Sequence, residues 1–370
     1  MKVLVVGGGS MGRRRLRDLL YLCPGEVTLL EPDSKRCQDV AAQFGVEGFT
    51  QLSDALRQKP AAMVVSTPPA LHESYVQEAI RNGIHVFCEL PFVFNRLSLV
   101  EIVAQVRQKK IVLGISATIR FYPPYAAIRK LLRESRIGDP FYLEYSLGNH
   151  IADWHPYEDY RKFYAADAAL GGAGMDMLLH ELAPIQWWLG DIASVAARLS
   201  KISPLQIKGP DSHDVLLTFK SGCRGFFHHD ILEQGTIGRH IRIVGERGTI
   251  EWHQNQPAIR LFLTEQGNRE IAFDQAPDWD EAISASREMA QILARQSAES
   301  EKIPSASGAN YSYESNYLRE MRHFVEAAGG KHPYAIATIQ EEMQTLQVFD
   351  AIMRSSKSMK ETLVENERVG

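Results

Sequence analysis

Three glycines near the start of the chain, Gly7, Gly9 and Gly12, have the spacing of a turn that holds the phosphates of a dinucleotide. They follow an apolar run at residues 3–6 and precede a predicted helix. The first glycine permits a tight turn, the second lets the backbone approach a pyrophosphate, and the third lets helix and strand pack closely. The pyrophosphate would lie at the positive end of that helix. The predicted contacts in this turn are Gly7, Gly9, Ser10, Met11 and Gly12.

A carboxylate stands where the ribose of such a cofactor would reach. Glu31 follows a second apolar run, Val27–Leu30, about 20 residues after the glycine turn. At this place an acidic residue accepts hydrogen bonds from the ribose hydroxyls of NAD. Arg36, close behind it, could pair with the 2′-phosphate of NADP, although Glu31 would repel that phosphate. The turn therefore favours NAD and leaves NADP open.

A second pair of residues could move a proton. Asp176 and His180 lie four positions apart in a predicted helix, which places both side chains on one face. A carboxylate can orient a histidine and stabilise its charged form, and histidine exchanges protons near neutral pH. The glycine-rich residues 171–174 before the helix leave backbone room for a ligand. We expect His180 to act as an acid/base that Asp176 orients.

The first 120 residues must position the glycine turn, and they alternate predicted strands and helices. The predicted strands are 2–6, 27–30, 62–66, 85–88 and 111–115, and the predicted helices are 13–22, 34–44, 52–57, 71–82 and 97–109. Such alternation is typical of an α/β fold with a doubly wound parallel sheet. We expect a dinucleotide-binding Rossmann domain at residues 1–120.

After residue 120 the pattern changes. Helices are predicted at 125–134, 176–189, 311–328 and 339–355, and strands at 142–147, 214–219, 224–230, 239–244 and 248–253. Residues 278–310 are polar and predict part helix, part loop. Closely spaced strands indicate a large, mostly antiparallel open sheet. We expect an α+β domain at residues 121–370 that binds substrate, with its last helices able to pack back on the first domain.

The composition excludes several classes of protein. The chain has 370 residues, 45% hydrophobic and 23% charged, with a net charge of −4 and one short arginine run at 13–15, so we expect no nucleic-acid binding. Four cysteines without paired spacing indicate a reducing compartment and no metal site. No stretch has the length of a membrane span, and no signal peptide precedes the first strand. These features predict a cytoplasmic protein.

Two further segments end predicted strands, where ligands bind in open α/β sheets. The first, Ser66-Thr67-Pro68-Pro69, is followed by His72, which could lean towards a nicotinamide ribose. The second is Glu89-Leu90-Pro91. The predicted cofactor contacts here are Ser66, Thr67, Pro68, His72, Glu89, Leu90 and Pro91.

Together with the glycine turn, these segments resemble the Gfo/Idh/MocA family of NAD(P)-dependent oxidoreductases, and the resemblance covers nearly the whole chain. It implies hydride transfer between the nicotinamide and a secondary alcohol or ketone of a sugar or sugar-derived acid. It also implies that Asp176 and His180 form the family's Asp-x-x-x-His motif, with His180 taking the hydroxyl proton, and that Arg120 binds the substrate. Members often associate through the C-terminal sheet, which implies a homodimer or homotetramer.

Leu90 departs from the family pattern, which has lysine in a Glu-Lys-Pro segment. That lysine contacts the reacting hydroxyl and the nicotinamide ribose, and losing one proton-transfer group commonly lowers the rate by about 10²–10⁴-fold. His180 could act alone, helped by a tyrosine or lysine elsewhere, which we favour because Asp176 and His180 are intact. The reaction could have changed, as in the biliverdin reductase branch, which also lacks the lysine. The protein could instead be a non-catalytic sensor or partner subunit that binds the cofactor. A further alternative is NAD-dependent cleavage of glycosides.

Residues 153–161 are dense in side chains that bind sugars. Aromatic rings can cover the C–H side of a sugar ring, Asp159 can accept from hydroxyls, and Arg161 can bind a carboxylate or phosphate through two hydrogen bonds. The segment resembles one in a family branch associated with cell-surface sugars, including sialic-acid-like sugars. The predicted substrate contacts are Arg120, Trp154, Tyr157, Asp159, Tyr160 and Arg161. The alternative is a loop whose aromatic residues pack under the second domain.

Several histidines lie on predicted strands of the second domain without the spacing of metal ligands. We expect them to be residues of a sheet face with no role in binding metal. They are His213, His228, His229 and His253.

Overall fold

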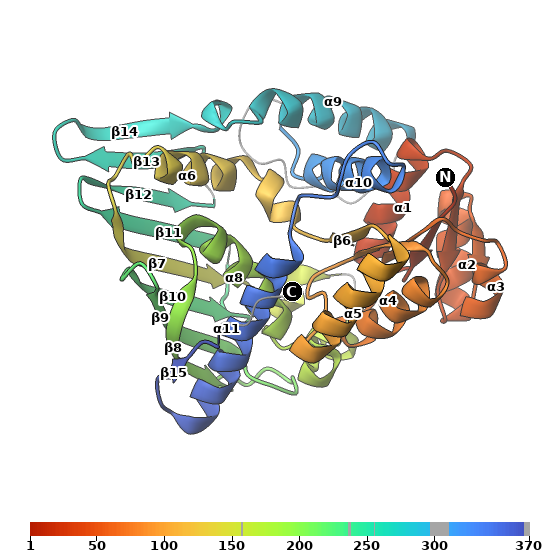
Figure 1. Cartoon of the computed structure of the whole chain (residues 1–370), viewed down its shortest axis with the longest axis horizontal. Coiled ribbons are helices and arrows are strands. Elements are labelled where there is room, and N and C mark those ends of the chain that lie inside the picture. The colour runs from red at the N-terminus through yellow and green to blue at the C-terminus, as the bar shows by residue number, and fades with distance from the viewer. Residues whose placement is uncertain (157, 236–237, 255, 297–310, 366–370) are drawn as a thin grey trace.

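The computed structural model describes residues 1–156, 158–235, 238–254, 256–296 and 311–365. Two sheets form its frame, one of six strands and one of nine, and helices fill the space between them (Figure 1). Among the described residues, no helix combines the length and apolar character that a membrane span needs.

The first sheet confirms the predicted doubly wound arrangement. Its strands run parallel in the order β3-β2-β1-β4-β5-β6. The strands read as continuous apolar runs because helices cover both faces, and all four residues of β1 and of β4 are buried. The strands are β1 (Val3–Val6), β2 (Val27–Leu30), β3 (Glu47–Phe49), β4 (Ala62–Val65), β5 (His85–Cys88) and β6 (Leu113–Ile115). The helices are α1 (Ser10–Leu22), α2 (Ser34–Phe44), α3 (Leu52–Leu56), α4 (His72–Arg81) and α5 (Arg96–Lys109).

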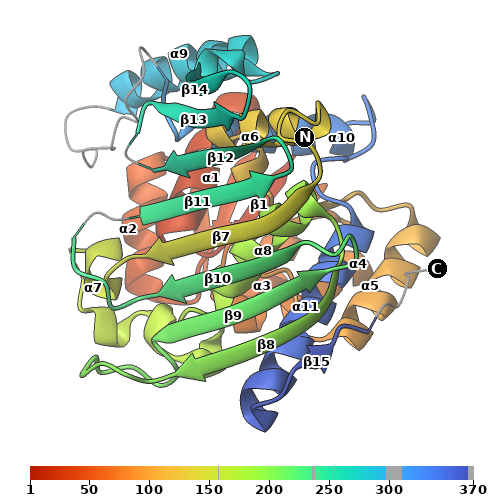
Figure 2. The ribbon, with the colours of Figure 1, turned by 90° about the vertical axis from the view of Figure 1, so that its left-hand side faces the viewer.

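The second sheet has the order β14-β13-β12-β11-β7-β10-β9-β8-β15. It is antiparallel except for the β7–β10 pair, so the predicted, mostly antiparallel sheet is confirmed. Figure 2 looks onto the face of this sheet that no described helix covers. The strands are β7 (Pro140–Gly148), β8 (Ile192–Ser200), β9 (Ser212–Phe219), β10 (Arg224–Asp230), β11 (Gly238–Gly245), β12 (Gly248–His253), β13 (Ala258–Leu263), β14 (Gly267–Ala272) and β15 (Thr362–Leu363).

The helices of the second half link the two sheets. Phe324 of α10 packs on Phe87 of β5 with ring centroids 5.5 Å apart, so α10 covers the first sheet although it follows the second in the chain. Helices α8 and α11 pack against each other, and α11 lies along β8 (Figure 1). The helices are α6 (Pro123–Arg133), α7 (Ile151–Trp154), α8 (Met175–Leu189), α9 (Trp279–Gln296), α10 (Ser315–Ala328) and α11 (Ile339–Ser358).

Candidate active site

The glycine turn between β1 and α1 has the shape that binding a pyrophosphate requires. A Cβ on Gly12 would lie 1.8 Å from the carbonyl oxygen of Gly7, and Gly7 itself has a φ of +102°, so both positions require glycine. A Cβ on Gly9 would meet no described atom within 4 Å. Gly9 is the N-cap of α1 and has no side chain that could accept from the first N–H groups of the helix. This turn fits a phosphate group.

Glu31 lies beside the turn as a buried, ionised carboxylate. Its Oε2 accepts from the N–H of Gly8 at 2.8 Å, and its Oε1 accepts from Asp33 N–H and Arg36 Nη2, each at 2.9 Å. Burial alone would raise the pKa of Glu31, but hydrogen bonds from Arg36, Asp33 and Gly8 lower it below its ordinary value. Arg36 is thereby neutralised by Glu31, an arrangement that suits a ribose with free hydroxyls better than a 2′-phosphate.

The end of β4 carries two buried side-chain oxygens, those of Ser66 and Thr67, that have no hydrogen-bond partner among the described residues. They lie where the strand order of the first sheet reverses, between β1 and β4. Ligands bind at this point in α/β sheets, and unpartnered buried oxygens are uncommon in folded proteins. The pair therefore fits the polar edge of a bound cofactor. Pro68 follows and caps a short helical turn, η1 (Pro69–Leu71).

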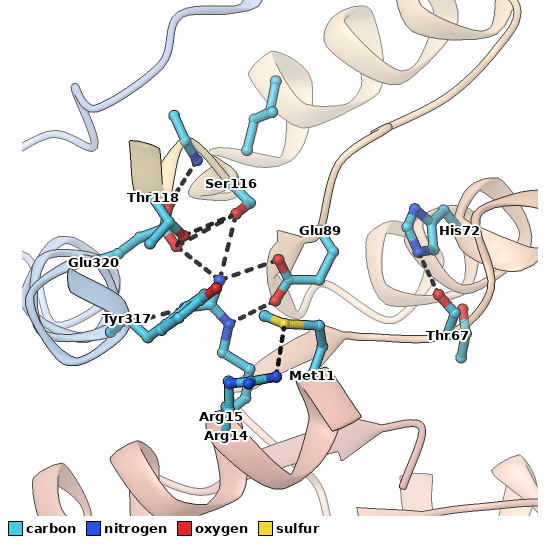
Figure 3. Close-up of polar contacts among 12 residues, drawn as sticks. Met11, Arg14, Arg15, Thr67, His72, Glu89, Ser116, Thr118, Tyr317 and Glu320 are labelled. Carbon is cyan, nitrogen blue, oxygen red and sulfur yellow. Dashed lines mark hydrogen bonds and ion pairs between the residues drawn. The ribbon is translucent and has the colours of Figure 1, made fainter. Parts of the chain in front are cut away.

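His72 joins two loops of the first domain. Its Nδ1 lies 2.7 Å from the carbonyl oxygen of Pro91. Its Nε2 lies 2.8 Å from the carbonyl oxygen of Thr67, the contact drawn in Figure 3. The residue is 1% exposed, and burial lowers its pKa. Both ring nitrogens are thus occupied by backbone, which leaves neither for the ribose that we expected His72 to contact.

Glu89, at the end of β5, faces the protein interior. It binds the fully buried Arg15 of α1 at 2.5 and 3.1 Å, and Arg15 also binds Glu320 of α10 at 2.7 Å (Figure 3). Because Arg15 pairs with both carboxylates, the three residues fix the glycine-turn helix to the strand end and to α10. Leu90 follows, half-buried against the apolar core, and a cis peptide bond links it to Pro91.

On the second-domain side, Asp176 and His180 lie on α8 as predicted, but they do not share a hydrogen bond. Asp176 accepts from the hydroxyl of Tyr164 at 3.1 Å, and burial raises its pKa to about 6. His180 instead places Nδ1 3.3 Å from Oε1 of Glu181. The expectation that Asp176 orients His180 is therefore corrected: Glu181 is the hydrogen-bonded carboxylate.

Glu181 is held in place by residues of two strands. It is 0% exposed, with Arg239 of β11 at 2.5 Å and the hydroxyl of Tyr145 of β7 also bound to it. Burial alone would raise the pKa of Glu181, but the Arg239 guanidinium and the His180 hydrogen bond hold it far below its ordinary value. An ionised Glu181 accepts from Nδ1–H of His180, which leaves the lone pair of the neutral ring on Nε2. Sequence reasoning missed this network because Arg239 is distant in the chain.

Close packing at Gly171 brings the segment before α8 against the first domain. A Cβ on Gly171 would lie 2.7 Å from the side chain of Pro69 and 2.9 Å from the ring of Phe94. This contact seats η5 (Ala168–Leu170) on η1 of the first domain. Burial raises the pKa of Tyr164, and the negative charges of Asp176 and, more weakly, of Glu89 raise it further. The start of α8 therefore faces the strand ends of the first sheet.

The predicted substrate residues have other partners in this structure. Arg120 binds Glu341 at 2.8 and 3.2 Å and stacks on Trp187, so in this structure it ties the second domain together, and its contact with a substrate stays a prediction. Trp154 and Tyr160 pack in a small apolar cluster around Ile151, as the structural alternative expected.

The other predicted residues of this segment lie at the surface. Arg161, whose side chain is 53% exposed, binds Asp159 through two hydrogen bonds of 2.7 Å. Tyr157 lies outside the described residues. Ser10 and Met11 lie in the first turn of α1, where their side chains contact Arg14 at 2.7 and 3.9 Å.

Comparison with protein-family models matches both halves of the chain. Residues 1–116 match the model described as oxidoreductase family, NAD-binding Rossmann fold, and residues 125–251 match the GFO/IDH/MocA C-terminal domain. An inositol 2-dehydrogenase of Acidothermus cellulolyticus is 27% identical over 280 residues, which are 72% of this chain and 76% of that protein. A D-apiose dehydrogenase of Paraburkholderia graminis is 25% identical over 60% of this chain and 58% of that protein.

Solved structures share the whole fold. Levoglucosan dehydrogenase in complex with NADH and L-sorbose superimposes with a TM-score of 0.79 at 18% identity, covering 100% of this chain and 99% of that one. An oxidoreductase from Agrobacterium radiobacter in complex with NAD+, L-tartaric acid and magnesium has a TM-score of 0.76 at 18% identity, covering 98% of each chain.

Proposed function

The chain belongs to the Gfo/Idh/MocA oxidoreductase family, and we propose that it transfers a hydride between NAD and a secondary alcohol or ketone of a sugar or sugar-derived acid. One observation carries the proposal: an open phosphate-binding turn at Gly9 and a histidine hydrogen-bonded to a buried carboxylate lie in the two halves of the chain that η1 and η5 bring into contact. The named dehydrogenases among its relatives act on polyols and sugars, which supports the substrate class.

The first domain supplies the binding groups for NAD. The N–H groups at the start of α1 would hold the pyrophosphate, and Glu31 would accept from the ribose hydroxyls. Ser66 and Thr67 would offer side-chain oxygens that have no partner among the described residues. When bound, the nicotinamide accepts or returns the hydride.

The second domain handles the proton. His180 takes it from the alcohol on Nε2, while Glu181 keeps Nδ1–H in place and stabilises the imidazolium that forms. Tyr164 and Asp176 form a second protic pair near the start of α8, and the charge of Glu89, the residue before Leu90, acts on Tyr164. A leucine side chain can neither donate nor accept a proton, so this pair is our candidate for assisting His180 where the family has lysine.

We also propose a substrate class, an oligomeric state and a cellular location for this chain. Segment 153–161 supports a substrate of the sialic-acid-like class, because Arg161 is exposed enough to exchange its Asp159 partner for a ligand carboxylate. Exposed apolar side chains on the uncovered face of the large sheet, such as Leu216 and Phe262, support a homodimer or homotetramer. The four described cysteines are buried and free, which supports a cytoplasmic location.

Because leucine replaces the family's lysine at position 90, a second candidate function is a sensor or partner subunit that binds NAD without turnover. The test combines calorimetry of NAD binding with the absorbance of NADH over a panel of polyols, sugar nucleotides and nonulosonic acids. We expect NAD to bind, NADH to form with at least one substrate, and Leu90→Lys to raise that rate. NAD binding without NADH formation, in both the wild type and Leu90→Lys, would favour the sensor.

The same panel separates the remaining alternatives. A product whose glycosidic bond is cleaved, with no net NADH, would indicate the glycoside-cleaving reaction. Oxidation of NADPH by a linear tetrapyrrole would indicate the change of reaction that the biliverdin reductase branch suggests.

A further inference from the structure

A cluster of two histidines and one glutamate lies on the uncovered face of the large sheet, away from α8. His240 of β11 stands directly opposite His253 of β12, and Glu251 lies two positions before His253 on the same face. Figure 2 looks onto these two strands. The neighbouring residue, Arg239, points to the other face, where it binds Glu181. The cluster is therefore separate from the proposed active site.

The three side chains converge at the spacing of metal ligands. Oε1 of Glu251 lies 3.4 Å from Nε2 of His240 and 3.8 Å from Nε2 of His253, and one ligand atom from each residue lies within 4.8 Å of the others. Zinc–nitrogen bonds of about 2.0–2.1 Å place the ligands of a tetrahedral site about 3.4 Å apart. The side chains are 21%, 25% and 42% exposed for His240, Glu251 and His253, so an ion can reach them from solvent.

The two imidazoles stack in parallel, with centroids 4.0 Å apart and planes 7° apart. Because an imidazole binds metal through a lone pair in the plane of its ring, at least one ring must rotate out of this stack for both to bind one ion.

Another histidine of the same cross-strand row has a carboxylate partner on each of its two ring nitrogens. His228 of β10 and His240 of β11 both pair with Ser146 of β7. His228 places Nδ1 2.8 Å from Asp214 and Nε2 3.0 Å from Asp230, and these contacts raise its pKa to about 9. It is a cation without a lone pair to offer, and so serves as a matched control.

A neighbouring arginine orients the carboxylate. Arg260 of β13 holds Oε2 of Glu251 at 3.0 Å, which leaves Oε1 facing the histidines. Its positive charge weakens attraction for a cation, but hydrogen bonds of this kind fix metal-binding carboxylates in place. Arg242, also on this face, lies 3.6 Å from Glu144.

We propose that His240, Glu251 and His253 bind one divalent transition-metal ion, zinc before others, with a fourth coordination position open to water. Imidazole and carboxylate ligands in this number suit zinc. The turn between β11 and β12 lies at Gly245 and Gly248, so the ion would join the two strands at the opposite, open end of the hairpin. The site does not depend on the proposed dehydrogenase activity, and it revises the expectation of a protein without metal.

The test titrates the full chain, freed of metal with EDTA, with zinc chloride in a calorimeter. We expect one zinc ion per chain. His240→Ala and His253→Ala should each weaken binding by at least about tenfold, and Glu251→Gln should weaken it as well. His228→Ala should bind zinc as the wild type does. Unchanged affinity in both histidine variants would overturn the proposal.

A measurement on the wild type keeps the proposal testable if a variant fails to fold. Crystals soaked in zinc and measured at the zinc absorption edge should show anomalous density between Nε2 of both histidines and Oε1 of Glu251. Density elsewhere on the chain, or no zinc binding in the calorimeter, would overturn the assignment.

Discussion

On the first-domain side of the candidate active site the backbone of the glycine turn supplies the phosphate-binding groups. On the second-domain side the groups are side chains, and their positions depend on parts of the chain that lie far away. The turn at Gly7, Gly9 and Gly12 is complete within one strand and one helix. His180, by contrast, depends on Glu181, which Arg239 holds from a strand of the large sheet. Local backbone geometry can be predicted from a motif, but the pairing of side chains depends on the assembled fold.

The largest expected effect falls on the second-domain side. His180→Ala removes the group that takes the proton, so turnover should fall by about 10²–10⁴-fold. The affinity for NAD should stay unchanged, because His180 does not belong to the glycine-turn side. Steady-state rates with the best substrate, together with NAD titration, check both parts. A variant that retains turnover would remove His180 from the mechanism and place the chemistry elsewhere.

The contrast between the two sides also explains what could be predicted. Strands β2 and β5 and helix α2 match their predicted limits, because apolar runs bounded by turn signals fix them locally. Strand β3 was missed because it has three residues, none of them buried. The glycine turn and Glu31 were predicted correctly in shape because the motif contains every group that defines them.

The second-domain side was predicted less well, for a physical reason. The spacing of Asp176 and His180 places them on one helix, but spacing cannot show that Tyr164 binds one and Glu181 the other. Arg120 was expected to bind the substrate because the family resemblance implied it. The fold instead gives it Glu341, a partner more than two hundred residues later, and that contact is visible only after folding.

Asp176 offers a pH-dependent test of the same side. Its folded pKa of about 6 exceeds the ordinary 3.8, so ionisation favours the unfolded chain. Its protonated form stabilises the fold fully below about pH 4, and this contribution is lost as the pH rises towards 6. Asp176→Asn should therefore unfold like the wild type at pH 4 and be more stable at pH 7, by up to about 3 kcal/mol. Urea unfolding at both pH values measures the difference, and equal stabilities at pH 7 would contradict it.

The glycine turn can be tested with a matched pair of variants. In Gly12→Ala the added Cβ meets the Gly7 carbonyl, so the turn must shift, which should lower stability by about 1–3 kcal/mol and abolish NAD binding. In Gly9→Ala the Cβ meets no described atom, so the melting temperature should hold while NAD binding weakens. Thermal unfolding and NAD titration separate the two effects. Equal loss of stability in both variants would show that Gly9 serves packing rather than the cofactor.

The smallest expected effect concerns Arg161, whose exposed side chain is the least constrained of the predicted substrate contacts on the second-domain side. Its ion pair with Asp159 is exposed, and exposed pairs contribute little to stability, so Arg161→Ala should unfold nearly as the wild type does. If this guanidinium binds the carboxylate of an acidic sugar, the variant should raise KM for that substrate and leave KM for neutral polyols unchanged. Its kcat should also stay near the wild-type value, because Arg161 is no part of the His180 network. A KM that rises equally for neutral and acidic substrates would show that Arg161 only maintains the shape of the loop. The second-domain side of the site would then consist of α8 and Tyr164.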